Sequence, residues 1–393
     1  MNILIFNEFY APHITGGAEI STQVLAEALV GMGHNVTVCT SAGKDYEDVI
    51  NGVKVYYMSL NPLYWAYKGG NVSKVKKLLW HTIDLYNIFC IAKVNRVIKT
   101  CKPDIIHTSN LSHFSCAVWK TAHQMNIPIC HTLRDFYLMC LKCTLFNGNE
   151  CTTRCPACKL FSRPKRKLSR YVDGVVGISS FILKKHAENR YFREDCLKTV
   201  IYNPIKNLKV SCNHNNGRIG YIGSLIPSKG IEKLINSFIT VNNPKLSLVI
   251  AGEGKESSFV EGLKSKSNGY NIRFMGRMKP AEFFSQIDLL VVPSLWNEPF
   301  GRVVVESVNY GVPVIATRKG GIAEILNGRS EGRLYDPSDD NNLTYLLSDY
   351  ALGKLSFDFS DVANFSKIYS EETCAESYLS FYNKIIQAKY ENK

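Results

Sequence analysis

Two glutamates separated by seven residues, Glu298 and Glu306, are the strongest chemical signal in the chain. They lie in the segment 297–306, NEPFGRVVVE, which follows an apolar run at 288–293. Carboxylates are poor ligands for phosphate but good acceptors for sugar and ribose hydroxyls. Gly301 leaves room for a phosphate near the start of a predicted helix. The pattern predicts a carbohydrate site, and the alternative is a pair of glutamates on a helix surface.

Two glycine-bearing loops suit a phosphate. Lys229 lies in the loop 223–230, GSLIPSKG, just before a predicted helix, where its charge adds to that of the backbone amides. The alternative is a solvated surface lysine. Gly16-Gly17 opens the first predicted helix and allows the same close approach of a phosphate, although an ordinary strand-to-helix turn has the same sequence.

These residues need elements that hold them at one edge of a sheet. The chain opens with a strand–loop–helix–strand pattern, which is typical of a doubly wound parallel sheet whose ligands bind beyond the carboxyl ends of the strands. Apolar runs without alternation suit parallel strands covered on both faces. Strands are predicted at 3–6, 36–38, 53–57, 104–107, 127–131 and 172–178, then at 218–223, 246–251, 271–275, 288–293 and 312–316, with long helices over 72–100 and 367–390.

The predicted fold is α/β, with two Rossmann-like doubly wound domains facing across a cleft. The first domain is predicted at 1–208 and the second at 217–365, joined by a polar linker. A last helix within 366–393 is expected to pack back toward the first domain.

The composition excludes several classes of protein. The 393 residues are 45% hydrophobic and 21% charged, which argues against disorder. No run approaches about 20 apolar residues, and Asn7 and Glu8 interrupt the N-terminal apolar run, so neither a membrane span nor a signal peptide is expected. A cytoplasmic protein is predicted.

The formal charge of +13 suits nucleic acid, an anionic membrane surface or anionic substrates. No nucleic-acid signature is present, so no nucleic-acid partner is expected. Two basic stretches favour an anionic bilayer, with a solvated charged face as the alternative. One is 163–170, RPKRKLSR; the other combines Tyr64, Trp65, Tyr67 and Lys68 with Lys74, Lys76 and Lys77.

On these residues the chain resembles the retaining glycosyltransferases of the GT-B fold, family 4 (group 1), over most of its length. The spacing of Glu298 and Glu306 is the most specific shared element, and the loops at 16–19, 229–230, 251–254 and 311–324 agree with it. The resemblance implies that Glu298 contacts the donor sugar, Glu306 the ribose and Lys229 the leaving diphosphate. It also implies retention of configuration and no cofactor required for catalysis. The donor-binding set is Gly16, Gly17, Gly223, Ser224, Arg277, Phe300, Gly301, Arg302 and Glu306, with Arg277 toward the nucleobase.

Two positions depart from the family pattern. Ser224 stands where the family often has an arginine, so neutralisation of the diphosphate depends on Lys229, helped by Arg302. Arg134-Asp135 replaces the family's His-Asp pair. An arginine cannot act as a general base but can bind a sugar hydroxyl or a phosphate. Glu298, Lys229, Arg134 and Asp135 are the predicted catalytic residues, and front-face attack is the working mechanism.

Five of the 13 cysteines fall within 140–158, an insertion in the first domain. Their spacing resembles that of structural zinc sites, with free or redox-active thiols as the alternative. The five are Cys140, Cys143, Cys151, Cys155 and Cys158.

The predicted function is retaining transfer of a sugar from a nucleotide-diphosphate sugar to a glycan or lipid-linked glycan in cell-surface polysaccharide biosynthesis, in the cytoplasm or on the inner face of the membrane. The alternatives are a non-catalytic sugar-nucleotide-binding protein, a sugar-nucleotide epimerase or phosphorylase-like enzyme of the same fold, and a zinc-knuckle protein that binds nucleic acid.

Overall fold

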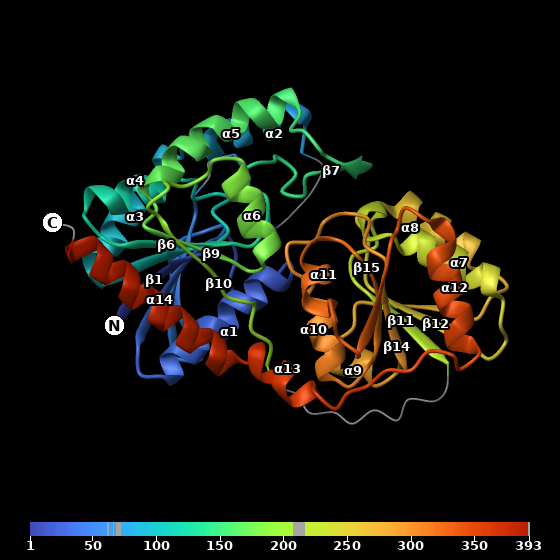
Figure 1. Cartoon of the computed structure of the whole chain (residues 1–393). Coiled ribbons are helices and arrows are strands. Elements are labelled where there is room, and N and C mark those ends of the chain that lie inside the picture. The colour runs from blue at the N-terminus through green and yellow to red at the C-terminus, as the bar shows by residue number, and fades with distance from the viewer. Residues whose placement is uncertain (61–62, 66, 68–71, 207–216, 392–393) are drawn as a thin grey trace. The chain divides into compact units, whose positions relative to one another are not determined.

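The computed structural model describes residues 1–60, 63–65, 67, 72–206 and 217–391. Lys68 and most of the predicted linker lie outside these residues. The chain divides into two compact units (Figure 1). The first comprises Met1–Leu145, Thr152–Lys206 and Ser370–Lys393, and the second comprises Phe146–Cys151 and Asn207–Tyr369.

The first unit is built on an eight-stranded sheet of order β10-β9-β6-β5-β1-β2-β4-β3. Its pairings are parallel except that of β3 with β4. Every residue of β5, β6 and β9 is buried, as expected for strands covered on both faces. The strands are β1 (Asn2–Phe6), β2 (Asn35–Ser41), β3 (Tyr46–Ile50), β4 (Val53–Met58), β5 (Ile105–Thr108), β6 (Ile129–Leu133), β9 (Gly174–Gly177) and β10 (Leu197–Val200).

Helix α14 (Glu371–Glu391) belongs to the first unit, although it follows the second unit in sequence. Helix α14 packs on α1 and β6, with the Tyr378 hydroxyl 2.9 Å from Thr132 Oγ1 and the Tyr382 hydroxyl 2.7 Å from His107 Nδ1. No described helix is both long and apolar enough to span a bilayer. The helices are α1 (Gly17–Gly31), α2 (Lys74–Leu85), α3 (Ile88–Cys101), α4 (Ala117–Gln124), α5 (Pro156–Leu168), α6 (Ser180–Glu188) and α14 (Glu371–Glu391).

The single helix predicted over 72–100 is wrong, because α2 and α3 are separate helices. The helical path ends at Tyr86, whose φ of −154° is extended. Asn87 then caps α3 by accepting a hydrogen bond from the Phe89 N–H. Its side-chain amide also donates to the carbonyls of Leu60 and His113, so the buried Asn87 fixes the corner.

The second unit is built on a six-stranded parallel sheet of order β13-β12-β11-β14-β15-β16. The strand order reverses between β11 and β14, the kind of position where doubly wound sheets bind ligands. The strands are β11 (Arg218–Ile222), β12 (Ser247–Ala251), β13 (Ile272–Gly276), β14 (Leu289–Val292), β15 (Val314–Thr317) and β16 (Gly332–Tyr335), and a small hairpin pairs β7 (Phe146–Asn147) with β8 (Asn149–Glu150). The helices are α7 (Ile231–Val241), α8 (Ser257–Lys266), α9 (Pro280–Phe284), α10 (Arg302–Asn309), α11 (Gly320–Leu326), α12 (Asp340–Ala351) and α13 (Val362–Ile368).

Candidate active site

The loops that follow β11 and β14 meet at the carboxyl edge of the second sheet. The Leu295 N–H donates to the Ser228 carbonyl over 2.9 Å, which joins the two loops. Gly230 has a φ of +69°, and a Cβ there would lie 1.9 Å from the Pro293 carbonyl oxygen. Only glycine fits this approach, which holds the neighbouring Lys229 against the β14 loop.

Lys229 and Glu298, predicted from separate loops, form an ion pair. Lys229 Nζ lies 2.9 Å from Glu298 Oε1, and the Ser294 hydroxyl donates to the same oxygen. The Lys229 ammonium also lies 5.4 Å from the centre of the Trp296 ring. Both charged side chains are partly exposed, at 25% and 12%, so a ligand can reach them.

Backbone amides at the start of α11 donate hydrogen bonds to the loop that carries Glu298. The Gly321 N–H donates to the Glu298 carbonyl over 2.8 Å, and the Gly320 N–H donates to Asn297 Oδ1 over 3.1 Å. A Cβ on Gly320 would lie 2.2 Å from the Glu298 carbonyl oxygen. The backbone around Glu298 is therefore fixed before any ligand binds.

The other predicted residues of this segment lie at the end of the β14 loop and in helix α10. Gly301, at a φ of +123°, precedes α10, and Glu306 lies in the second turn of that helix. Burial raises the pKa of Glu306, and Arg302, whose Nε lies 2.7 Å from Glu306 Oε1, opposes that rise. The Phe300 ring is 3% exposed and packs on Tyr369, so its side chain supports the loop from inside.

Gly223, Ser224 and Arg277 follow β11 and β13 at the same edge. Gly252 follows β12, and a Cβ on it would lie 1.8 Å from the Gly223 carbonyl oxygen, so the loops after β11 and β12 also touch. The Ser224 carbonyl accepts a hydrogen bond from the Tyr221 hydroxyl over 2.9 Å. Arg277 follows β13 directly and is exposed.

The Gly16-Gly17 turn in the first unit differs from its prediction. The Gly16 N–H donates to Glu19 Oε2 over 2.7 Å, which is one of the two hydrogen bonds of a capping box; Gly16 has no side chain to form the other. Glu19 is buried, and its pKa is raised by that burial. The Gly16 amide therefore has an internal partner, so a phosphate there would have to displace Glu19.

Arg134 also lies differently from its prediction. The residue is 6% exposed, its Nε donates to Ser109 Oγ over 2.7 Å, and its Nη1 donates to Asn203 Oδ1. The guanidinium thus ties the end of β6 to the loop after β5 and to Asn203. This geometry gives Arg134 a positioning role, rather than the predicted contact with a sugar hydroxyl or phosphate.

Asp135 lies beside acidic residues at the carboxyl edge of the first sheet. Its Oδ1 accepts a 2.7 Å hydrogen bond from the Tyr137 N–H. Burial raises the pKa of Asp135 to about 7; the charges of Glu8 and Glu19 add to the rise, and the Tyr137 N–H and Lys165 oppose it. Glu8 was not predicted, although an acidic residue just beyond the first strand was a signal available in the sequence.

Replacing Asp135 with Asn is expected to stabilise the protein above pH 7. Folding raises the pKa of Asp135 from 3.8 to about 7, so the folded protein loses stability as the pH rises through that interval. Asn does not ionise, so the variant avoids this loss. The free energy of unfolding should therefore match wild type near pH 3 and exceed it by about 1–3 kcal/mol at pH 8. Denaturant unfolding across this range measures it, with Asp48→Asn as the surface control. A constant difference at every pH would contradict the assignment.

Lys165, predicted within an exposed basic stretch, is instead 5% exposed. Its Nζ lies 3.5 Å from Asp84 Oδ2 and 3.2 Å from the centre of the Tyr137 ring. The Tyr137 hydroxyl donates to the same Asp84 oxygen over 2.7 Å. This buried cluster joins α5 to α2 and to the loop that carries Asp135.

Two aromatic residues predicted to face a membrane contact other rings of the first unit, although Tyr67 remains 36% exposed. The ring centres of Trp65 and Tyr67 each lie 4.9 Å from that of His13, and Tyr67 also contacts Phe9. These rings cover the loop after β1.

The cysteine insertion places Cys155 and Cys158 together at the start of α5. Cys155 is the N-cap residue, and its sulfur accepts the Cys158 N–H over 3.4 Å. Cys158 and Cys140 border the same small cavity. The described residues include no group of three or more His, Cys, Asp or Glu side chains arranged to hold a metal.

The zinc site stays a prediction from the spacing of Cys140, Cys143, Cys151, Cys155 and Cys158. Protein purified under reducing conditions should carry about one zinc per chain if four thiolates close around an ion. Elemental analysis checks this, and a double Cys155→Ser/Cys158→Ser variant should lose the metal. Metal-free wild type would favour free thiols.

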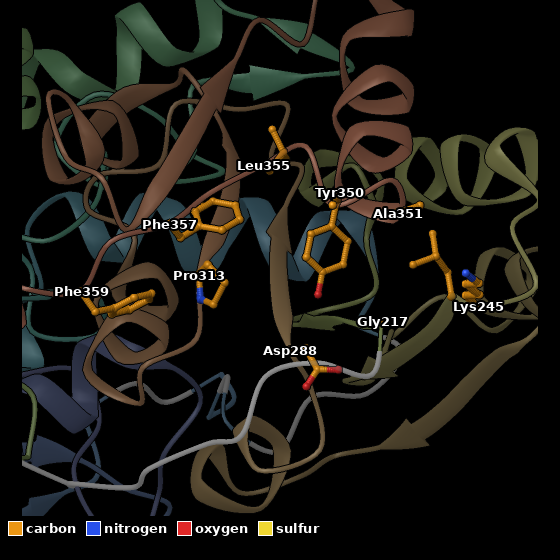
Figure 2. Close-up of a pocket in the computed structure, with 11 residues that line it drawn as sticks. Gly217, Lys245, Asp288, Pro313, Tyr350, Ala351, Leu355, Phe357 and Phe359 are labelled. Carbon is orange, nitrogen blue, oxygen red and sulfur yellow. The ribbon is translucent and has the colours of Figure 1, made fainter.

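The large cavity of the second unit lies at the opposite edge of its sheet. The cavity has a volume of about 880 Å³. It is bordered by Gly217, Asp288 and Pro313 (Figure 2), which directly precede β11, β14 and β15. Asp288 is paired with Arg218 over 2.8 Å, and Tyr350 and other aromatic rings line much of the rest. The cavity is therefore separate from the Lys229–Glu298 pair.

Comparison with known proteins agrees with this geometry. Residues 207–352 match the family model "Glycosyl transferases group 1", and residues 15–206 match "Glycosyltransferase Family 4". An uncharacterized 42.6 kDa protein in the cps region of Klebsiella pneumoniae is 35% identical over 389 residues, covering 97% of this chain and 100% of that protein.

Solved structures share the fold. Sucrose-phosphate synthase from Thermosynechococcus elongatus superposes with a TM-score of 0.75 at 18% identity, covering 98% of this chain and 99% of that one. HepE from Anabaena in complex with UDP and glucose gives 0.73 at 19% identity, with 97% and 99% covered. The two doubly wound units thus define a protein of the GT-B class. The chain belongs to the group 1, family 4 glycosyltransferases.

Proposed function

We propose that this enzyme transfers a hexose, with retention of configuration, from a nucleoside diphosphate sugar to a glycan or lipid-linked glycan in cell-surface polysaccharide biosynthesis. The observation that carries the proposal is the Lys229–Glu298 pair, held by fixed loops at the carboxyl edge of the second sheet. The cps-region relative and the UDP and glucose of HepE support the pathway and the donor class.

Each residue has a chemical task in this proposal. Breaking the sugar–phosphate bond develops negative charge on the diphosphate and positive charge on the sugar. Lys229 and the loop amides stabilise the diphosphate, and Glu298 accepts a hydrogen bond from a sugar hydroxyl. Glu306 binds the ribose, with Arg302 setting its orientation over 2.7 Å. The acceptor attacks from the face that the diphosphate leaves, with no metal required.

The first unit is proposed to hold the acceptor. Asp135, whose pKa is raised to about 7, and the nearby Glu8 suit hydrogen bonds from acceptor hydroxyls. Trp65 and Tyr67 supply flat apolar faces for a sugar ring. The enzyme works in the cytoplasm, at the inner face of the membrane when the acceptor is lipid-linked.

A thermal-shift screen against a panel of nucleoside diphosphate sugars tests the proposal first, because a tight ligand raises the unfolding temperature by mass action. The stabilising donor is then incubated with acceptor, and NMR gives the anomeric configuration of the product. Inversion would overturn the retaining mechanism. Binding without transfer or hydrolysis would favour a sugar-nucleotide-binding protein, and conversion of the donor to its epimer would favour an epimerase.

A further inference from the structure

Helix α2 turns apolar side chains outward. Val75, Leu78 and Leu79 are exposed by 70%, 57% and 51%, and their spacing places them on one face of the helix. The opposite side of α2 carries the buried Trp80 and Asp84. The helix therefore has a packed face and a second apolar face that no described residue covers.

The neighbouring helix α5 adds charge to this surface. The two helices pack against each other (Figure 1), and the buried Lys165–Asp84 ion pair joins them. Leu160 on α5 is 60% exposed. The exposed cations of the two helices are Lys74, Lys76, Lys77, Lys159, Arg163, Arg166 and Lys167.

The charge of this surface has one sign. Asp84 is the sole acidic residue in α2 and α5, and it is buried. Exposed apolar side chains surrounded by cations alone suit a partner that is apolar inside and anionic at its surface. A bilayer containing anionic lipid has this chemistry. Exposed apolar patches also mark protein–protein interfaces, and the exposed charges of one sign beside this patch favour the anionic bilayer.

We infer that the outer face of α2 and α5 docks the enzyme on an anionic membrane. Leu78, Leu79 and Val75 insert among the headgroups, and the cations bind lipid phosphates. The inference rests on the proposed function in that a lipid-linked acceptor lies at such a surface. The docking face is distinct from the Lys229–Glu298 pair, which lies in the second unit.

Vesicle flotation tests the inference with the full chain. Wild type is expected to float with phosphatidylcholine vesicles that contain phosphatidylglycerol, to float much less with phosphatidylcholine alone, and to be released by high salt. Lys76→Gln/Lys77→Gln should weaken binding about tenfold or more. Leu78→Ser/Leu79→Ser should weaken it comparably, and the loss should persist at low salt.

Matched controls remove the same groups elsewhere. Lys264→Gln/Lys384→Gln changes the net charge equally, and Tyr345→Ser/Leu352→Ser removes two side chains that are each 63% exposed. Both controls should bind as wild type does. If the α2 variants bind like their controls, or if wild type does not prefer anionic vesicles, the inference is overturned. A lipid-free dimer that Leu78→Ser/Leu79→Ser dissociates would also overturn it.

Donor hydrolysis separates this result from the proposed function. The α2 variants should hydrolyse the nucleoside diphosphate sugar at the wild-type rate while losing vesicle binding. Vesicle binding by a protein that neither binds nor hydrolyses any donor would leave the docking face intact and overturn the proposed function alone.

Discussion

Glu298→Gln is expected to lower turnover about 100-fold to 1,000-fold while the protein stays folded. The substitution keeps the size of the side chain but removes the charge that pairs with Lys229 over 2.9 Å. A neutral amide is a weaker acceptor for a sugar hydroxyl than a carboxylate, and Lys229 would lose its fixed partner. Steady-state transfer rates at saturating donor measure the effect, and circular dichroism with thermal unfolding checks the fold.

The second unit offers a matched control for this variant. Glu232, in the first turn of α7, and Lys266, at the end of α8, form an exposed ion pair of 2.7 Å in which neither Lys229 nor Glu298 takes part. Glu232→Gln should leave turnover unchanged, because exposed ion pairs contribute little to stability. Wild-type turnover in Glu298→Gln would remove Glu298 from the active site.

The sequence predicted the residues that the structure brings together at the carboxyl edge of the second sheet, because local signals there agree. The glycine loops, the position of Lys229 before a helix and the spacing of Glu298 and Glu306 all depend on residues close together in the chain. The structure adds what spacing cannot give, which is that Lys229 and Glu298, 69 residues apart, meet through the adjacent strands β11 and β14.

The structure departs from the sequence-based expectations where a distant partner fixes the direction of a side chain. Arg134 is turned inward by Ser109 and Asn203, and Lys165 by Asp84, which is 81 residues away. Strands β3 and β10 were not predicted because they lie at the edges of the sheet and have few buried side chains. A partner distant in the chain fixes Arg134, Lys165 and β10, whereas β3 pairs with β4 through a two-residue turn.

Lys229→Ala is expected to lower catalytic efficiency for the donor by about tenfold to more than a hundredfold. The loss of a charge-assisted hydrogen bond to the diphosphate costs about 1.5–3 kcal/mol. Ser224 supplies no second cation in the β11 loop, and Arg302 is engaged with Glu306 over 2.7 Å. Lys229 therefore bears more of the diphosphate charge. Lys229→Arg should retain part of the efficiency, because the charge remains while its geometry changes.

A double-mutant cycle separates two roles of Lys229, holding Glu298 and binding the donor. If Lys229 only positions Glu298, Lys229→Ala/Glu298→Gln should be no worse than Glu298→Gln alone. If Lys229 also binds the diphosphate, the double variant should lose donor affinity beyond Glu298→Gln, as a rise in the KM for donor. Lys266→Ala in the surface pair controls for the loss of a lysine. Equal donor efficiency in Lys229→Ala and wild type would place the diphosphate elsewhere, and Arg302 would be the next residue to replace.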